Sequence, residues 1–221
     1  EDAPAIPVGT VHKQFGNLLQ MCSARLANGQ RLNIALIGPA GTGKSTAAEQ
    51  VATAMGLSFY PQSAIDSKFE LFGFRTATGE VVRTAFREAW EHGGVFLYDE
   101  LSASSQSAII AFNGALANGL APFPDGAIRR HPDCIILAGD NVIGGATADY
   151  NARNKVDQAS VDRFVYLDWP IDPMLERSIT GNDSWVDLVM SIRHAVQTKG
   201  IRGVLVTPRA SVNGAALLRA G

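Results

Sequence analysis

Residues 38–45, GPAGTGKS, constrain the fold of this chain more than any other segment. They fit the pattern G-x-x-x-x-G-K-[ST], in which glycines let backbone N–H groups curl around phosphate oxygens. The apolar residues 32–38 predict a strand before the loop, and helix-forming residues 45–55 follow it. A phosphate-binding loop requires this context, because the following helix adds the positive end of its dipole. The context therefore favours a nucleotide-binding loop over a glycine-rich turn without a ligand.

A second apolar stretch, VFLYDE at residues 95–100, ends in two adjacent carboxylates. Alone it could be a strand that ends at the surface, because adjacent acids repel each other and are costly to bury unpaired. Beside a phosphate loop, Asp99 is expected to hold Mg²⁺ through water, and Glu100 to polarise the water that attacks the γ-phosphate of ATP. Lys44 is expected to bridge the β- and γ-phosphates, and the Ser45 hydroxyl to hold Mg²⁺ together with Asp99.

The residues predicted to bind the nucleotide and its metal ion come from these two segments. They are Gly38, Pro39, Ala40, Gly41, Thr42, Gly43, Lys44, Ser45, Thr46 and Asp99.

The hydrophobic pattern predicts strands that alternate with helices. Strands are expected at residues 32–38, 57–62, 95–99, 134–140 and 164–170, and helices at 11–29, 45–55, 81–94 and 104–118. This alternation predicts an α/β fold, an αβα sandwich around a parallel five-stranded sheet. Residues 64–80 are expected to form a long connection, and residues 120–133, rich in proline and glycine, a hairpin or loop insertion.

After residue 170 the pattern becomes helical only. Helices are expected at residues 174–179 and 184–200, and a third should begin at Thr207 and Pro208, a capping residue and a first-turn proline. We therefore expect a nucleotide-binding domain at residues 1–170 and a small helical lid domain at 171–221.

Composition excludes several classes of protein. The net charge is −2, so no overall basic field attracts nucleic acid, although a local basic patch stays compatible. Cys22 and Cys134 lie in unrelated segments, which fits neither a disulfide framework nor a zinc spacing and favours a reducing, cytoplasmic location. No apolar run reaches the roughly 18 residues that a membrane span needs. The first ten residues lack the basic start and apolar core of a signal peptide.

The motifs GPAGTGKS, FLYDE, ILAGDN, VDRF and TPRA follow one another along the chain. In this order they resemble the AAA+ ATPases, with their P-loop fold and helical lid. The resemblance covers nearly the whole chain. It is strongest to the MoxR-type and dynein-related branch, which includes midasin and the cobalt-chelatase ATPase subunit. AGDNVIGG followed by NKVDQASVDRF is particularly similar to the chelatase subunit.

The resemblance implies roles for three polar residues. Asn141 matches sensor 1, which orients the attacking water together with Glu100; by itself it could be a strand-end residue that caps a turn. Asp140, just before it, departs from the usual pattern. Arg163 matches the arginine finger, which reaches the γ-phosphate of the neighbouring subunit.

The alternative for Arg163 is a surface pair with Asp162, and Arg153 and Arg130 are rival candidates for the finger. Arg209 matches sensor 2, which contacts the γ-phosphate from the lid of the same chain. Its alternative is an ordinary helix-surface arginine, although the helix dipole disfavours a cation near a helix N-terminus.

Three phenylalanines lie where this superfamily carries its pore loop. Phe69, Phe72 and Phe74 could grip a peptide or partner in a central channel, or pack against the sheet or a neighbouring subunit. The segment APFPDGAIRRHP resembles a hairpin insert of the same branch. Its Arg129 and Arg130 could contact a partner or be solvated.

The function that these features imply is ATP hydrolysis with Mg²⁺ by a homo-oligomeric ring, hexameric by resemblance, that remodels a bound protein partner. A von Willebrand factor A-type partner is implied by the same branch, and nucleic acid is a less favoured partner. Two alternatives stay open. A P-loop small-molecule kinase would need an acceptor pocket and an arginine-rich lid, and the helical C-terminal part and Glu100 disfavour it. A nucleotide-gated scaffold with little turnover is disfavoured by the intact Lys44, Asp99 and Glu100.

Overall fold

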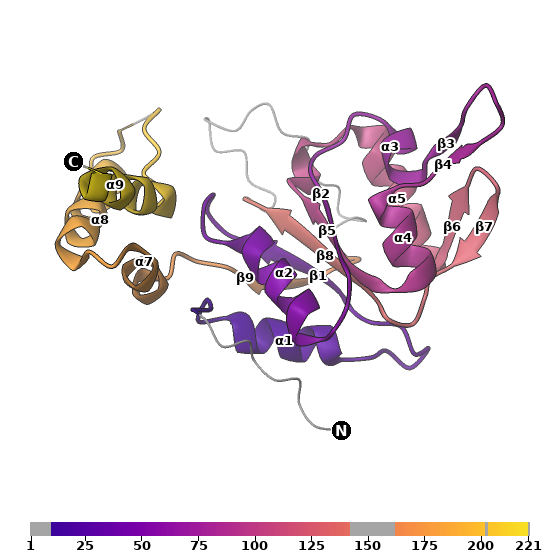
Figure 1. The fold of residues 1–221 in the computed structure, drawn as a ribbon, viewed down its shortest axis with the longest axis horizontal. Coiled ribbons are helices and arrows are strands. Elements are labelled where there is room, and N and C mark those ends of the chain that lie inside the picture. The colour runs from indigo at the N-terminus through magenta and orange to yellow at the C-terminus, as the bar shows by residue number, and fades with distance from the viewer. Residues whose placement is uncertain (1–9, 142–161, 202, 221) are drawn as a thin grey trace.

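The computed structural model describes residues 10–141, 162–201 and 203–220 of the chain (Figure 1). Residues 1–9 and the rival finger residue Arg153 lie outside these described residues.

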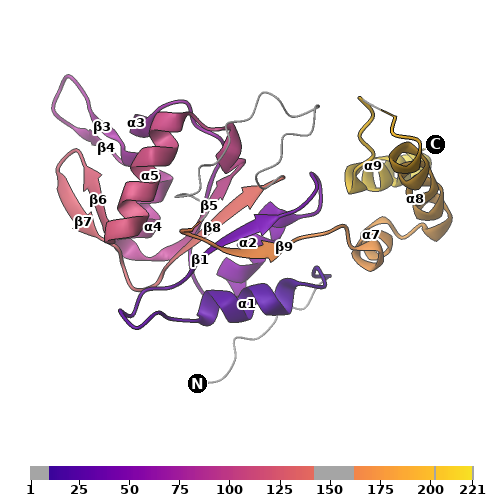
Figure 2. The same ribbon diagram turned by 180° about the vertical axis from the view of Figure 1, so that it is seen from behind.

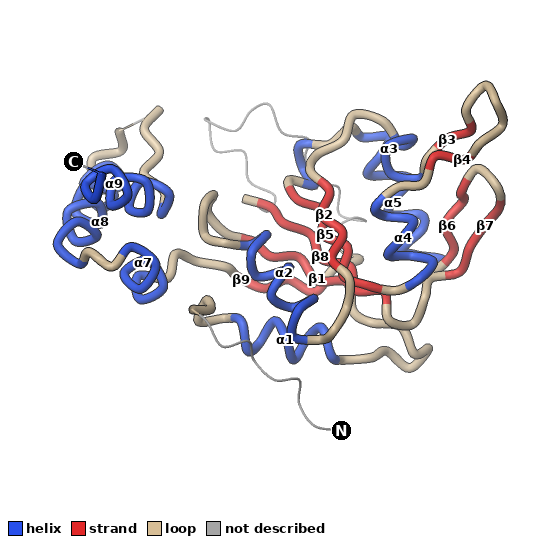
Figure 3. Tube along the Cα trace, viewed as in Figure 1, coloured by secondary structure: helices blue, strands red, loops and turns tan. Residues whose placement is uncertain are grey.

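A five-stranded sheet forms the centre of the fold (Figure 3). Its strands are β1 (Asn33–Ile37), β2 (Phe59–Gln62), β5 (Gly94–Asp99), β8 (Cys134–Asp140) and β9 (Val165–Asp168). They lie in the order β2-β5-β8-β1-β9, and every neighbouring pair is parallel. The predicted parallel five-stranded sheet of a P-loop αβα sandwich is therefore confirmed, and every strand begins and ends within two residues of its predicted bounds.

Alternation along the strands builds one hydrophobic core on each face of the sheet. In β5, Val95 and Leu97 point into one core, and Phe96 and Tyr98 point into the other. The first core is closed by α1 (Phe15–Ser23) and α2 (Lys44–Ala54), and the second by α3 (Lys68–Phe72), α4 (Ala85–His92) and α5 (Gln106–Asn118). Figures 1 and 2 show these two helical layers on opposite sides of the sheet.

Two short hairpins lie at the end of the molecule that is remote from the C-terminal helices (Figure 1). One pairs β3 (Phe74–Arg75) with β4 (Val81–Val82), and the other pairs β6 (Leu120–Phe123) with β7 (Gly126–Arg129). The second confirms the hairpin expected at residues 120–133. The Arg75 Nε–H donates to the Pro124 carbonyl (3.2 Å), which joins the two hairpins.

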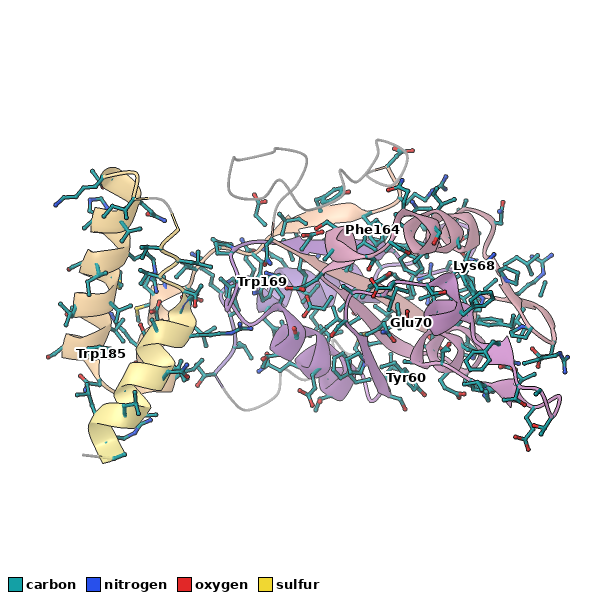
Figure 4. All side chains as sticks on the ribbon, turned by 90° about the horizontal axis from the view of Figure 1, so that it is seen from above. Tyr60, Lys68, Glu70, Phe164, Trp169 and Trp185 are labelled. Carbon is teal, nitrogen blue, oxygen red and sulfur yellow. The ribbon has the colours of Figure 1, made fainter. Side chains whose placement is uncertain are left out.

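The segment after β9 is helical, as predicted. It forms α7 (Pro173–Thr180), α8 (Asp183–Thr198) and α9 (Pro208–Ala220). Two guanidinium nitrogens of Arg193 on α8 donate to the two carboxylate oxygens of Glu176 on α7, at 3.1 and 2.8 Å. Trp185, labelled in Figure 4, donates its indole N–H from α8 to the Ser211 carbonyl on α9 (3.0 Å). These polar contacts hold the three helices together.

The prediction of a helix over residues 11–29 was wrong at both ends. The helix covers only Phe15–Ser23, because Ala24 is extended (φ −67°, ψ 144°) and Arg25 pairs with Arg31 in an isolated β-bridge. Leu26, four residues after the buried Cys22 and so at helical spacing from it, is exposed.

Two further boundaries differ from the prediction. The helix expected over 81–94 begins at Ala85, because Thr84 caps it and the two preceding valines form β4. The helix expected from residue 104 begins at Gln106, where the Ser105 hydroxyl accepts from the Ala108 N–H. The connection expected at 64–80 contains α3 and β3.

In the part of the chain that the structure describes, no helix combines the length and the apolar composition that crossing a bilayer requires.

Candidate nucleotide-binding site

The glycine-rich loop lies at the carboxyl end of β1 and runs into α2, as the sequence predicts. Two of its glycines are required by geometry. A Cβ at Gly38 would lie 1.8 Å from the Trp169 carbonyl oxygen, and Gly43, the N-cap of α2, is left-handed (φ +83°). The loop can therefore follow this path only with glycine at these positions, and the first-turn N–H groups of α2 lie next to the cleft.

The loop borders a cleft of about 330 Å³. Three other segments complete its lining: the carboxyl ends of β5 and β8, and the start of α9. The structure thus brings together most of the predicted site residues. The lining residues are Ala40, Gly41, Thr42, Gly43, Lys44, Ser45, Thr46, Asp99, Glu100, Asn141 and Arg209. Gly38 and Pro39 lie at the base of the loop and offer their carbonyls to Lys44.

The Lys44 ammonium lies at the centre of this arrangement and is almost completely buried. Its Nζ donates to the carbonyls of Gly38 (2.8 Å) and Pro39 (3.1 Å) and to Oδ1 of Asn141 (2.9 Å). An ammonium has three N–H donors, so these contacts match its donor number. Lys44, predicted to bridge the β- and γ-phosphates, and Asn141, predicted to orient the attacking water, are therefore in direct contact.

The two predicted metal ligands are also in contact. The Ser45 hydroxyl donates to Oδ2 of Asp99 (2.7 Å), which joins the first turn of α2 to the end of β5. Hydroxyl and carboxylate oxygens are ligands that Mg²⁺ accepts, so this pair fits the ion. A Cβ at residue 139 would lie 2.5 Å from Oδ1 of Asp99, so Gly139 on β8 makes the room for this carboxylate.

Glu100 has an unusual backbone. Its φ is +54°, and among the described residues it is the only one other than glycine with a positive φ. The left-handed region costs such a residue about 1–3 kcal/mol, and it persists only where the surroundings impose it. Here Oδ1 of Asp99 accepts from the Glu100 N–H (3.1 Å), and the Glu100 carbonyl accepts from the Ala103 N–H (2.9 Å). The sharp turn directs Glu100 into the cleft rather than along the strand.

Arg209 reaches the cleft from the C-terminal helices. It is the second residue of α9, and its exposed side chain passes the glycine-rich loop, where a Cβ at Gly41 would lie 3.1 Å from its Cγ. The cleft is therefore lined both by residues at the edge of the sheet and by Arg209 of α9.

Arg163 lies apart from the cleft. It precedes β9, and Val165 pairs with Ile34 near the start of β1, so Arg163 is at the amino end of the strands, opposite the glycine-rich loop. Its carbonyl accepts from Nδ2 of Asn33 (3.1 Å). It cannot act on the cleft of its own chain from this place.

The rival Arg130 is buried and cannot be a finger or a partner contact, which corrects that expectation. Its guanidinium donates to Oδ1 of Asn33 (2.7 Å) and to the Cys134 carbonyl (2.8 Å) and lies over the Trp90 ring. Burial lowers the pKa of this guanidinium. Arg129, its neighbour on β7, is exposed.

The three pore-loop candidates separate into two groups. Phe72 is 6% exposed and packs against Phe86 and Phe123 in the core, so the expectation that it is available to a partner was wrong. Phe69 and Phe74 are 55% and 47% exposed. The alternative that at least one of the three packs internally is therefore confirmed for Phe72.

Sequence reasoning missed several residues that shape the site. Trp169, between the sheet and the C-terminal helices in Figure 4, donates its indole N–H to the Thr42 carbonyl (3.1 Å). His12 stacks on Trp169 with ring centroids 4.0 Å apart, and its Nε2 lies 2.8 Å from the Pro170 carbonyl. In the sequence, only the position of Trp169 next to the predicted domain boundary near residue 170 could have indicated its role in the site.

A sequence model of the family described as "ATPase family associated with various cellular activities (AAA)" matches residues 34–164. The chain belongs to the AAA family. The match includes the glycine-rich loop, both acids at the end of β5, and Asn141. The AAA family is one of ATPases, which supports nucleotide binding and ATP hydrolysis in general. No curated protein is significantly similar to the chain.

Solved structures share the fold of this AAA chain. NtrX from Brucella abortus has a TM-score of 0.61 at 16% identity, over 97% of this chain and 51% of that one. A variant of RuvB from Thermotoga maritima has a TM-score of 0.62 at 13% identity, over 98% of this chain and 65% of that one. A putative ATPase from Cytophaga hutchinsonii has a TM-score of 0.55 at 16% identity, over 95% of this chain and 59% of that one. The chain spans about half to two thirds of the length of these proteins.

Proposed function

We propose that this AAA chain hydrolyses ATP with Mg²⁺ in the cleft between the glycine-rich loop and Arg209. The convergence of Lys44, Ser45, Asp99, Glu100 and Asn141 at the carboxyl ends of three neighbouring strands carries the proposal. A Mg²⁺ ion held by Ser45 and Asp99 would neutralise charge on the phosphates. Their direct hydrogen bond already puts the two side chains within reach of one ion.

The other residues of the cleft have distinct roles in this proposal. Lys44 binds the terminal phosphates in place of the loop carbonyls and Asn141 that it now contacts. Glu100 polarises the attacking water, and Asn141 orients that water from the next strand. Arg209 contacts the γ-phosphate from α9 and thereby reports the nucleotide state to the C-terminal helices.

Arg163 acts in trans in this proposal. Its position at the amino end of the sheet, away from its own cleft, supports a role in the cleft of a neighbouring subunit. A finger supplied by a neighbour requires assembly, and a repeated head-to-tail contact closes into a ring when the rotation permits. We therefore propose a homo-oligomeric ring, a hexamer by resemblance to the MoxR-type and dynein-related branch.

The domain division and the partner belong to the same proposal. The boundary falls near residue 170, and residues 171–221 act as a lid whose movement follows hydrolysis. The ring remodels a protein partner, with the exposed Phe69 and Phe74 as candidate contacts. The resemblance to the cobalt-chelatase subunit suggests a von Willebrand factor A-type partner.

Phosphate release per subunit, measured over a range of protein concentrations, tests the proposal. Specific activity should rise with concentration, because each active site needs a neighbour. Glu100→Gln should lower kcat roughly a hundredfold or more while nucleotide binding persists. Glu80→Gln, which changes an exposed hairpin carboxylate, is the matched control. A flat specific activity would exclude the trans site, and a Glu100→Gln variant as active as the control would exclude Glu100 as the base.

A further inference from the structure

Asp140, the last residue of β8, is a buried carboxylate that does not line the cleft. It is 6% exposed. Its Oδ2 accepts from the Ser102 backbone N–H (2.9 Å), and its Oδ1 accepts from the Ser102 hydroxyl (2.8 Å) and from the Asn141 N–H (2.7 Å). A buried carboxylate needs such donors to offset its loss of hydration. Asp140 thus holds two segments that are 38 residues apart in the chain.

The first of these segments positions Glu100. Ser102 lies in the short 3₁₀ helix Leu101–Ala103, which follows Glu100 directly. Glu100 is left-handed, a conformation that the turn must impose on it. This 3₁₀ turn is fixed to β8, because the backbone N–H and the hydroxyl of Ser102 both donate to Asp140. Asp140 therefore contributes to the direction in which the Glu100 side chain leaves the strand.

The far side of the same turn has a separate anchor. The Ser104 hydroxyl accepts from Tyr98 (2.8 Å) and from the Ile65 N–H (3.0 Å), and the Ile65 carbonyl accepts from the Ser105 N–H (2.8 Å). These hydrogen bonds connect the turn to the segment before α3. The hydrogen bonds of Asp140 connect the same turn to β8 and to the Asn141 N–H.

We propose that Asp140 is a positioning residue that fixes Glu100 relative to Asn141 across the cleft. The inference rests on the proposed ATPase function, in which these two side chains act on the same water. One carboxylate holds the Asn141 N–H and the turn after Glu100, so the two groups cannot shift independently while it is intact. Misplacement by about 1 Å can cost roughly a hundredfold in rate, which makes such a link effective.

The site requires a carboxylate rather than an amide at residue 140. Both backbone donors, Ser102 N–H and Asn141 N–H, point at different oxygens of the same group. In Asp140→Asn, the new NH₂ group must face one of these N–H donors, because an amide has only one acceptor oxygen. The substitution conserves the shape of the side chain and breaks one side of the link.

The test compares kcat and nucleotide affinity in Asp140→Asn, Ser102→Ala and a matched control. Ile135→Val changes a buried residue near the other end of β8 and controls for lost stability. In Asp140→Asn we expect kcat to fall about tenfold or more, with the Kd for a fluorescent ATP analogue within about threefold. Ser102→Ala removes the hydroxyl but keeps the backbone N–H that donates to Asp140, so its kcat should fall less than that of Asp140→Asn. If kcat in Asp140→Asn falls no more than kcat in Ile135→Val, the proposal is overturned.

A double-substitution cycle separates positioning from a general structural effect. If Asp140 acts through Glu100, then adding Asp140→Asn to Glu100→Gln should change the remaining rate by less than about twofold. A full multiplicative loss in the double variant would overturn action through Glu100.

Amide hydrogen exchange distinguishes failure of this inference from failure of the proposed function. A wild-type chain that releases no phosphate at any concentration would contradict the ATPase function itself. In either case, whichever of the Ser102 and Asn141 amides faces the new NH₂ group should exchange about tenfold faster in Asp140→Asn than in wild type or Ile135→Val. Unchanged exchange at both amides would show that Asp140 holds neither segment, and would overturn the inference by itself.

Discussion

The Lys44 ammonium donates a 2.9 Å hydrogen bond to Oδ1 of Asn141, across 97 residues of sequence. Lys44 begins α2, beyond the loop that follows β1, and Asn141 comes directly after β8, the strand beside β1. A lysine of the phosphate loop and an amide of the next strand therefore share one position in the cleft. A γ-phosphate that binds Lys44 must compete with this amide, so nucleotide binding and the placement of Asn141 are coupled.

Substitution of Asn141 should separate turnover from binding. Asn141→Ala removes the amide that is proposed to orient water, so kcat should fall about 10–100-fold, while the affinity for ATP should not fall because the amide no longer competes for Lys44. Asn141→Asp places a carboxylate beside Lys44 and should lower the affinity for ATP through repulsion. Steady-state kinetics and equilibrium binding check both. A normal kcat in Asn141→Ala would exclude the proposed role.

Arg209 should distinguish ATP from ADP. Its side chain reaches the cleft from α9, so Arg209→Ala should weaken ATP binding roughly tenfold while ADP binding changes less, because only ATP offers a γ-phosphate. Titration calorimetry with ADP and a non-hydrolysable ATP analogue measures the difference. Arg219→Ala, in the last turn of the same helix, is the control. An equal loss for both nucleotides would argue that Arg209 supports only the fold.

The buried pair of Glu176 and Arg193 should dominate the local stability of the C-terminal helices. Arg193→Met leaves the Glu176 carboxylate without its ion pair and should destabilise these helices by about 3–5 kcal/mol. The double variant with Glu176→Leu should be less destabilised, because no unpaired charge stays buried.

Hydrogen exchange in α7, α8 and α9 measures this local stability. Arg177→Met, which breaks an exposed pair with Asp187, should leave exchange nearly unchanged. A double variant as unstable as the sum of its parts would contradict the account of this pair.

His12 should make stability depend on pH. Burial lowers its pKa from the ordinary 6.5, with the Pro170 carbonyl and Asp172 opposing the shift. As the pH falls below about 6.5, His12 becomes protonated in the unfolded chain but stays neutral in the folded chain. The contribution of His12 to the free energy of unfolding is therefore complete above this pH and decreases below it. Urea unfolding at pH 7.5 and 5.5 measures the loss, which should be smaller in His12→Phe, a variant that retains an aromatic ring against Trp169. An equal loss of unfolding free energy between pH 7.5 and 5.5 in wild type and in His12→Phe would contradict the assignment of this pH dependence to His12.

The sheet and the loop were predictable because their signals are local. An apolar strand, a glycine-rich loop and a helix follow one another in residues 32–55, and two apolar strands end at Asp99 and at Asp140, each followed directly by a polar residue. Parallel strands bring such ends to one edge of the sheet, which is why the site residues converged as expected.

The errors arose where distant contacts decide the structure. The helical periodicity of residues 11–29 continues to Leu26, but Arg25 and Arg31 both bind Asp133, which lies about a hundred residues away and holds this segment out of the helix. The phenylalanines of residues 69–74 resemble one another in sequence, yet only Phe72 faces Phe86 and Phe123. The links from Asp140 to Ser102 and from Trp169 to Thr42 have no local pattern.

The measurement that tests the central claim most directly is subunit mixing. A Glu100→Gln chain has an intact Arg163, and an Arg163→Ala chain has an intact Glu100; each alone should be nearly inactive. In an equal mixture, about a quarter of the sites combine an intact Glu100 with a neighbour's intact Arg163, so activity should recover toward about a quarter of wild type. If the mixture stays as inactive as its two components although the chains assemble, Arg163 does not complete a neighbour's site.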